Sequence, residues 1–246
     1  MIQVRGLTVK FDTLTVLDNV DLAIQRGEVL GILGPGGAGK SVLIKLVCAL
    51  LRPTSGTVFI AGEDVHALNS QALARVRTQI GMLFQNYALF DFMTVFQNVA
   101  FPLQQSGQFS ETEMRTRVLA RLEQVGLLHA QALYPNELSG GMKKRVSLAR
   151  ATITEAPILL YDDPTAGLDP VTSSKIFDLV RALHRPNETT TVVISHDVDR
   201  LRGVCDRFAL LYHGTVLFQG TLKEAMESDH PIVHTFFTGE GDGESL

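Results

Sequence analysis

Four glycines, a lysine and a serine stand close together at a spacing that suits phosphate binding. The stretch reads Gly34, Pro35, Gly36, Gly37, Ala38, Gly39, Lys40 and Ser41, which is the G-x-x-x-x-G-K-[ST] pattern. Glycines let the backbone curl with its N–H groups pointing inward, and a helix that starts here adds partial positive charge. Lys40 can reach the β- and γ-phosphates, and the Ser41 hydroxyl can bind Mg²⁺. The pattern predicts a nucleotide site.

The residues on either side of this loop have the composition that the chemistry needs. Residues 28–33 form a short apolar run typical of a strand. After the loop, apolar residues fall on one face of a predicted helix, namely Val42, Leu43, Leu46, Val47 and Leu50. A glycine-rich turn before an ordinary helix is the alternative, and it explains neither Lys40 nor Ser41.

Polar residues end three further apolar runs. Asp162 and Asp163 close residues 157–161; Asp162 is the candidate Mg²⁺ ligand and Asp163 is placed to polarise an attacking water. Gln85 follows residues 80–84 and could contact Mg²⁺ or a water, and His196 follows a β-branched run and could contact a γ-phosphate. Taken alone, a glutamine or histidine at a strand end is more often structural, and Asp-Asp-Pro could merely start a turn.

A second helix start is predicted at Ser139, a good N-cap residue followed by Gly140 and Gly141. Apolar residues then recur with helical spacing at Met142, Val146, Ala149 and Ile153. The positive end of this helix is a second candidate anion site, with Lys143, Lys144 and Arg145 adding charge close by. By itself such a helix start is weak support. Asp169 lies in a predicted loop further on.

The segments before and between these motifs carry aromatic residues. Residues 1–26 alternate like antiparallel strands, and Phe11 sits where a turn begins, so it could stack on a nucleotide base or fill an edge-strand core. Residues 86–139 have helical periodicity, which predicts an inserted helical subdomain. Its aromatic entry, residues 87–92, could dock another protein or serve the subdomain's own core.

Composition excludes several classes of protein. The chain has 246 residues, 45% hydrophobic and 20% charged, which suits a globular protein with a sizeable core. Its net charge of −4 argues against a nucleic-acid-binding surface, and two distant cysteines imply no disulfide framework. We find neither a signal peptide nor an apolar run long enough to span a bilayer, so a membrane role is expected to act through a partner.

These motifs, in this order, resemble those of the ATP-binding cassette (ABC) ATPases. The matching parts are the Walker A loop at 34–41, the Q-loop at Gln85, the signature at 138–141, Walker B ending at Asp162, the D-loop with Asp169 and the switch histidine His196. The resemblance implies an α/β P-loop NTPase fold of ABC type, with a RecA-like core, an antiparallel β region and an inserted α-helical subdomain. It places a single ATPase domain at 1–225, with its core at 1–85 and 146–220 and its helical subdomain at 86–145, followed by a tail at 226–246. Phe11 takes the position of the adenine-stacking aromatic.

The resemblance also implies partners and cofactors. In this family two copies pair head to tail, and each ATP, with Mg²⁺, lies between the Walker A loop of one copy and Ser139, Gly140 and Gly141 of the other. Residues 86–103 match the surface that receives an integral membrane permease, so the protein is expected at the cytoplasmic face of the cell membrane. The stretches 88–103, 160–162 and 231–239 look like those of Mla/Mce-type lipid transporters, whose assemblies include an Mce-domain protein and can include a small regulatory subunit.

Two positions depart from the family pattern. Gly36 replaces a common serine, which costs at most one hydroxyl contact. Asp163 replaces the catalytic glutamate and is one methylene shorter. A slow transport ATPase and an ATP-gated clamp that hardly hydrolyses ATP therefore both stay open, as does the ATPase of another importer, such as one for amino acids. A soluble ABC protein acting on DNA or ribosomes is disfavoured by the acidic charge and the single cassette.

Overall fold

The computed structural model describes residues 1–184 and 188–239, and these residues form two compact units. The first unit joins residues 1–77 to the described residues from 188 onward, and the second spans residues 78–184.

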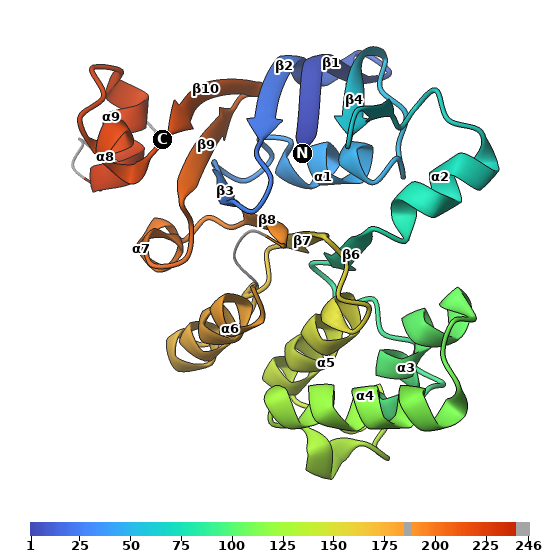
Figure 1. Cartoon of the computed structure of the whole chain (residues 1–246). Helices are drawn as coiled ribbons and strands as arrows, with labels where there is room; N and C mark the ends of the chain where they lie inside the picture. The colour runs from blue at the N-terminus through green and yellow to red at the C-terminus, as the bar shows by residue number, and fades with distance from the viewer. Residues whose placement is uncertain (185–187, 240–246) are drawn as a thin grey trace. The chain divides into compact units, whose positions relative to one another are not determined.

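The first unit contains an antiparallel sheet built from the N-terminal residues. Its strands are β1 (Ile2–Phe11), β2 (Leu14–Ile24), β4 (Ser55–Ile60) and β5 (Glu63–Asp64), in the order β2-β1-β4-β5. Because successive residues of a strand face opposite sides, burial alternates along β1 in two stretches. Ile2 and Val4 are buried before a register shift in the pairing with β2, and Leu7 and Val9 are buried after it. Helix α1 (Lys40–Val47) lies next to β4 (Figure 1). The predicted N-terminal strands are confirmed.

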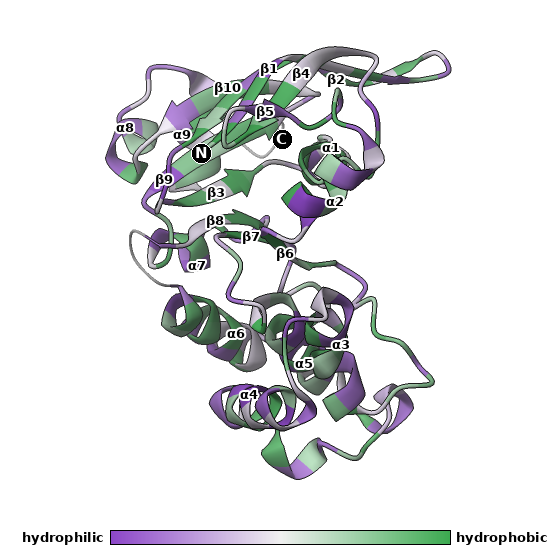
Figure 2. Ribbon diagram, turned by 45° about the vertical axis from the view of Figure 1, so that its right-hand side comes forward, coloured by the Kyte–Doolittle hydropathy of each residue, from purple (hydrophilic) through white to green (hydrophobic). Residues whose placement is uncertain are grey.

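A second set of strands in this unit surrounds β3 (Val29–Leu33). This strand pairs in parallel with β8 (Thr190–Ile194) on one side and with β9 (Arg207–Tyr212) on the other. Strand β10 (Thr215–Gly220) pairs antiparallel with β9, which confirms the predicted closing hairpin. All five residues of β3 are buried, and the strand is hydrophobic along nearly its whole length (Figure 2). The helices of this unit besides α1 are α2 (Ser70–Arg77), α7 (Val198–Arg202), α8 (Leu222–Met226) and α9 (Pro231–Thr238).

The helix after the phosphate loop is shorter than predicted. It ends at Val47, and Ala49 has a positive φ of 52°, so the chain leaves the helical path before Leu50. Leu50 is 49% exposed and does not belong to the buried face on which the sequence placed it. Alanine is not a residue type that marks a left-handed turn, so this helix end had no sequence signal.

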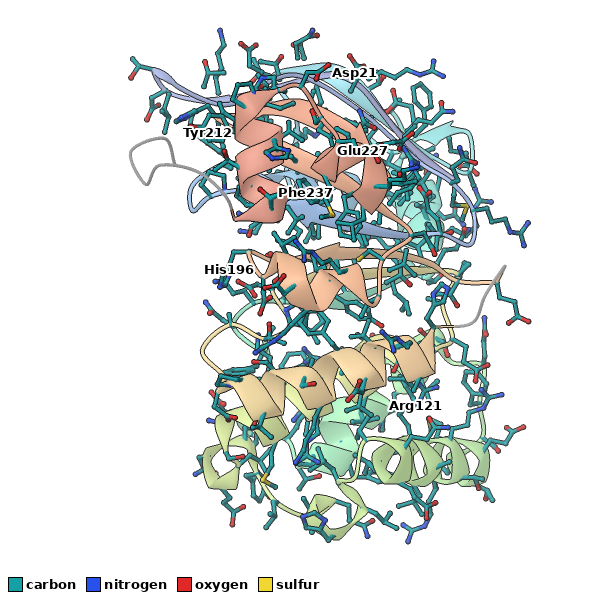
Figure 3. All side chains as sticks on the ribbon, turned by 90° about the vertical axis from the view of Figure 1, so that its left-hand side faces the viewer. Asp21, Arg121, His196, Tyr212, Glu227 and Phe237 are labelled. Carbon is teal, nitrogen blue, oxygen red and sulfur yellow. The ribbon has the colours of Figure 1, made fainter. Side chains whose placement is uncertain are left out.

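Helix α9 of the tail packs within the first unit and buries Val233 and Phe237. The ring of Phe237 on α9 lies 5.6 Å from that of Phe208 and 5.9 Å from that of Phe218, both in edge-on geometry (Figure 3). The Arg202 guanidinium donates to the Phe237 carbonyl oxygen. Of the predicted tail at 226–246, residues 240–246 lie outside the described residues.

The second unit combines two parallel strands with a helical bundle. Strands β6 (Ile80–Leu83) and β7 (Ile158–Asp162) pair in parallel. The helices are α3 (Val95–Ser106), α4 (Glu111–Gln124), α5 (Gly140–Thr152) and α6 (Pro170–Leu183). Helices α3, α4 and α5 share a buried core that includes Val99, Leu122 and Val146. On α4, hydrophobic residues are interspersed among hydrophilic ones (Figure 2), and the buried Val118 and Leu122 are four residues apart.

The helical character predicted for residues 86–139 is confirmed. The structure describes this range throughout and finds no strand in it. Short 3₁₀ turns at Leu128–Ala130 and Pro135–Glu137 connect α4 to α5. The second unit extends beyond this range to β6, β7 and α6, and the boundaries expected for a RecA-like core and a helical subdomain stay a prediction.

Candidate functional site

The predicted phosphate loop runs from the carboxyl end of β3 to the first turn of α1. Its first and last glycines are required by close neighbours. A Cβ atom on Gly34 would lie 2.0 Å from the Leu211 carbonyl oxygen, and one on Gly39 would lie 2.6 Å from Leu17 Cδ2. Gly39 also has a φ of +100°, a conformation that residues with a side chain rarely adopt. The pattern's fixed glycines therefore have a steric cause in this chain.

The middle of the loop and its lysine carry the kinds of hydrogen-bond donor that a phosphate site needs. A Cβ atom on Gly36 or Gly37 would meet nothing within 4 Å. The Lys40 ammonium donates to the carbonyl oxygens of Gly34 at 2.6 Å and Pro35 at 2.7 Å, so it is held across its own loop. Helix α1 has no acidic residue in its first turn. Positive charge and backbone N–H groups thus meet at a helix start, and these residues fit a nucleotide's phosphates.

Two further predicted residues lie in the same unit. Phe11 ends β1 at the hairpin and is 47% exposed, so its interpretation as an edge-strand core residue is wrong and its ring is accessible to a ligand. His196 follows β8 and precedes α7 (Figure 3). Because β3 and β8 are parallel, with Ile32 opposite Ile194, the loop at Gly34 and His196 leave the same edge of the sheet.

The second unit brings Gln85 and the two aspartates together in the same manner. Strands β6 and β7 are parallel with Leu83 opposite Tyr161, so Gln85 and Asp162 follow neighbouring carboxyl ends. Asp162 is buried and closes β7. Asp163, the next residue, has a positive φ of 46°, a left-handed conformation that aspartate adopts more readily than most residues.

Lys144 connects the segment at Gln85 to the segment at Asp163. The sequence did not predict this connection. Its ammonium donates to the Gln85 carbonyl oxygen at 2.7 Å and to the Asp163 carbonyl oxygen at 3.0 Å. The side chain is fully buried. Burial lowers the pKa of Lys144, while Asp163 and Asp162 act to raise it. The expectation that Lys144 adds charge to the anion site at Ser139 is therefore wrong.

The helix start at Ser139 has the predicted cap. The Ser139 hydroxyl accepts a hydrogen bond from the Met142 N–H, and Ser139 and both following glycines line a cavity of about 770 Å³. Arg145 also lines this cavity and donates to the Val125 carbonyl oxygen at 3.0 Å. Of the basic residues expected here, Arg145 is thus beside the site.

Asp169 lies at the same cavity and caps the next helix. Its carboxylate accepts a hydrogen bond from the Thr172 N–H at 2.9 Å at the start of α6. Hydrogen bonds from Thr172 hold the pKa of Asp169 below its usual value. The predicted loop at Asp169 is therefore a helix cap, and its carboxylate is ionised at neutral pH.

The described part of the chain contains no ready-made metal centre. Among the residues that the structure describes, no group of three histidine, cysteine or acidic side chains could hold one. Mg²⁺ is commonly bound by one or two protein oxygens together with nucleotide phosphates and waters. The Ser41 hydroxyl and the Asp162 carboxylate have this chemistry, and their role as ligands stays a prediction.

The aromatic segment after Gln85 divides between surface and core. Phe92 is 75% exposed, whereas Leu89 and Phe96 pack against the buried core of α3, α4 and α5. The loop is held by the buried Asn98, whose amide nitrogen donates to the carbonyl oxygens of Phe90 and Met93 at 3.1 and 3.0 Å. Phe92 is therefore accessible to a partner, and its use in docking stays a prediction. No helix within the described ranges is long and apolar enough to cross a membrane.

Comparisons with known proteins agree on one family. The family model described as ABC transporter matches residues 17–166. The chain is 37% identical over 243 residues to the intermembrane phospholipid transport system ATP-binding protein MlaF of Haemophilus influenzae, covering 99% of this chain and 92% of that protein. It is 40% identical over 240 residues to the methionine import ATP-binding protein MetN of Carboxydothermus hydrogenoformans, covering 96% and 71%.

A solved structure has the same fold. It is the dimeric structure of an ATP-binding cassette in a post-hydrolysis state bound to ADP and Pi. The match has a TM-score of 0.84 with 34% sequence identity, over 90% of this chain and 98% of that one. The expected α/β cassette fold is confirmed.

Proposed function

This chain belongs to the ABC transporter family and is the ATPase subunit of an ABC transporter, and we propose that its transporter moves phospholipid or another hydrophobic molecule between membranes. Two observations support this cargo. First, residues 88–103 and 231–239 resemble the corresponding stretches of lipid-transport ATPases. Second, the chain aligns with MlaF over 99% of its length.

We propose a role at the ATP site for each of the predicted residues. Lys40 and the backbone of the loop at 34–41 bind the phosphates, and Phe11 stacks on the base. Ser41, Gln85 and Asp162 would hold Mg²⁺, and the ion would supply neutralisation of the phosphate charge. Asp163 orients the attacking water, and His196 contacts the γ-phosphate. The open loop around Gly36 and Gly37 and the held Lys40 ammonium support this assignment.

A second copy completes the site in this proposal. Ser139, Gly140 and Gly141 of one copy bind the ATP held by the other copy's phosphate loop, and Asp169 lies beside them. The capped helix start and the cavity that Ser139 shares with Asp169 support this role. Such a head-to-tail dimer would sit at the cytoplasmic face of the cell membrane, with the permease bound near residues 86–103. An Mce-domain protein and a small regulatory subunit are further expected partners.

The test is a transport assay on the assembly purified from membranes with an affinity-tagged chain. Reconstituted into vesicles, it should move a fluorescent phospholipid to acceptor vesicles when MgATP is added. The same preparation carrying Lys40→Ala should not. ATP-dependent uptake of methionine without phospholipid movement would overturn the lipid proposal and leave the ATPase assignment standing.

An amino-acid importer is the second candidate because relatives named MetN reach 40% and 46% identity.

The ATP-gated clamp is the other alternative, and the shorter side chain of Asp163 favours it. Tight ATP binding by the purified assembly with negligible turnover, restored by Asp163→Glu, would support the clamp.

A further inference from the structure

One face of helix α5 carries three polar side chains at intervals of three residues. These are Lys144, Ser147 and Arg150. Residues three apart on a helix lie on neighbouring turns of one side. All three donate hydrogen bonds to backbone carbonyl oxygens of one short segment, residues 85–88. We call these three residues the α5 clasp.

The segment that the clasp holds has a strained backbone. Tyr87 and Ala88 have positive φ angles of 59° and 50°, a conformation that costs free energy for residues with a side chain. The Tyr87 carbonyl oxygen accepts from Ser147 Oγ and from Arg150 Nη2, each at 2.9 Å. Arg150 Nη1 donates to the Ala88 carbonyl oxygen at 2.6 Å. Two side chains thus fix the conformation of the two strained residues.

Lys144 links the segment that the clasp holds to Asp163. Its buried ammonium bonds to the carbonyl oxygens of Gln85 and Asp163 and lies 5.0 Å from the centre of the Tyr87 ring. A buried charge is costly unless it is well paired. Asp162 and Asp163 are the acidic groups that face it. An ammonium can meet two carbonyl oxygens and an aromatic face at once. A leucine or methionine would remove the donor from both carbonyl groups, and the Asp163 carbonyl oxygen would then keep the hydrogen bond that it accepts from the Ala166 N–H at 3.2 Å.

We propose that Lys144 is a positioning residue that fixes the backbone of Asp163 relative to Gln85, so that displacement of the segment 85–88 is passed to the carboxylate that orients water. Ser147 and Arg150 hold the far end of the same segment. This inference rests on the proposed role of Asp163. It goes beyond that role because residues 86–103, the proposed permease surface, begin inside the segment that the clasp holds.

Kinetics of Lys144 variants give the first test. Lys144→Met keeps the length and apolar character of the side chain and removes its donors. We expect kcat to fall about 10- to 100-fold, the range that a displacement of about 1 Å can cause, with the Kd for ATP changed by less than about twofold. Lys144→Gln retains two N–H donors and should recover much of kcat. Lys45→Met, on the exposed face of α1, is the matched control and should leave both constants unchanged.

A double-mutant cycle separates positioning from a general structural role. If Lys144 acts through Asp163, then Lys144→Met should cause almost no further loss of kcat in an Asp163→Asn chain. An equal fold-loss in both backgrounds would overturn the proposal. So would a fall in ATP affinity that matches the fall in kcat.

Hydrogen exchange of the full chain tests the same inference without turnover. Lys144→Met should speed amide exchange in residues 84–88 and 162–166 and leave α4 at its wild-type rate. Faster exchange throughout the chain would overturn the proposal. So would an unchanged exchange rate in both segments. A wild-type chain without ATPase activity would count against hydrolysis as the function, while the exchange result would still decide on the clasp. If Lys144→Met does not fold, Ser147→Ala should show faster exchange in 85–88 alone.

Discussion

The Cγ2 atom of Thr172 lies 2.7 Å from the position that a Cβ atom on Gly141 would occupy. A methyl group on a β-branched side chain cannot swing aside as a long flexible chain can. The start of α5 and the first turn of α6 are therefore packed so closely that residue 141 must be glycine. This requirement exists in a single chain, independently of any bound phosphate.

We predict that Gly141→Ala destabilises the protein by about 1–3 kcal/mol, the usual cost of overpacking, although alanine is the better helix former. Urea unfolding measures this change. Thr172→Ser removes Cγ2 and should restore most of the lost stability in the double variant. If the double variant stays as unstable as Gly141→Ala, then Thr172 is not the cause.

Lys40→Ala should weaken ATP binding without unfolding the protein. The substitution removes the ammonium that is held between the Gly34 and Pro35 carbonyl oxygens, and with it the charge proposed to contact the phosphates. We expect ATP affinity to fall at least about tenfold. Equilibrium binding of a fluorescent ATP analogue provides the measurement. Lys45→Ala, five residues further along α1, controls for general loss of positive charge.

The sequence predicted the strand, loop and helix start at residues 34–41 because glycine spacing, a lysine and apolar periodicity all pointed to one structure. It also predicted the cap at Ser139, which is a local interaction. The burial of Lys144 was not predictable in this way. Three consecutive basic residues look equivalent along the chain, and the direction of the Lys144 side chain depends on segments 19 and 59 residues away.

Asp163→Asn should lower the ATPase rate about 100-fold and leave ATP binding intact, if Asp163 orients the attacking water as proposed. Steady-state turnover of the assembly purified from membranes measures this. An unchanged rate in Asp163→Asn would refute the role. A rise of about tenfold or more in Asp163→Glu would mean that the shorter aspartate limits the chemistry, as the sensitivity of such sites to a displacement of about 1 Å allows.

Acid should weaken the cap of α4. Glu113 accepts hydrogen bonds from the Ser110 N–H at 2.9 Å and the Ser110 hydroxyl at 2.7 Å, and these lower its pKa from the ordinary 4.5. A carboxylate with a depressed pKa stabilises the fold above its ordinary pKa, and the stabilisation is lost as pH falls through the folded value.

Glu113→Gln should therefore lower the melting temperature at about pH 7, and the difference from wild type should shrink by about pH 3.5. Thermal unfolding followed by circular dichroism at both pH values gives the comparison. Glu111→Gln, in the same first turn but outside the capping box, is the control. A difference in melting temperature that grows on acidification would contradict a lowered pKa for Glu113 in the folded protein.

Phe92 should contribute to binding the membrane partner and not to binding ATP. Its ring is 75% exposed and lies 5.9 Å from the Phe90 ring, which in turn lies 4.8 Å from the Phe101 ring. Exposed aromatic residues beside a packed cluster often dominate the energy of protein interfaces. Phe92→Ala should therefore reduce the membrane protein recovered with the tagged chain at least about tenfold, equivalent to roughly 1.4 kcal/mol.

The matched control for Phe92 is Leu128→Ala, because Leu128 is an exposed apolar residue of the same unit outside residues 86–103. Quantitative mass spectrometry of detergent extracts compares recovery for both variants, and the Kd for ATP is measured on each purified chain. Loss of membrane protein with Leu128→Ala but not with Phe92→Ala would move the docking surface away from residues 86–103. Loss of membrane protein with Phe92→Ala alone, at unchanged ATP affinity, would show that the exposed Phe92 ring binds the partner and takes no part in nucleotide binding.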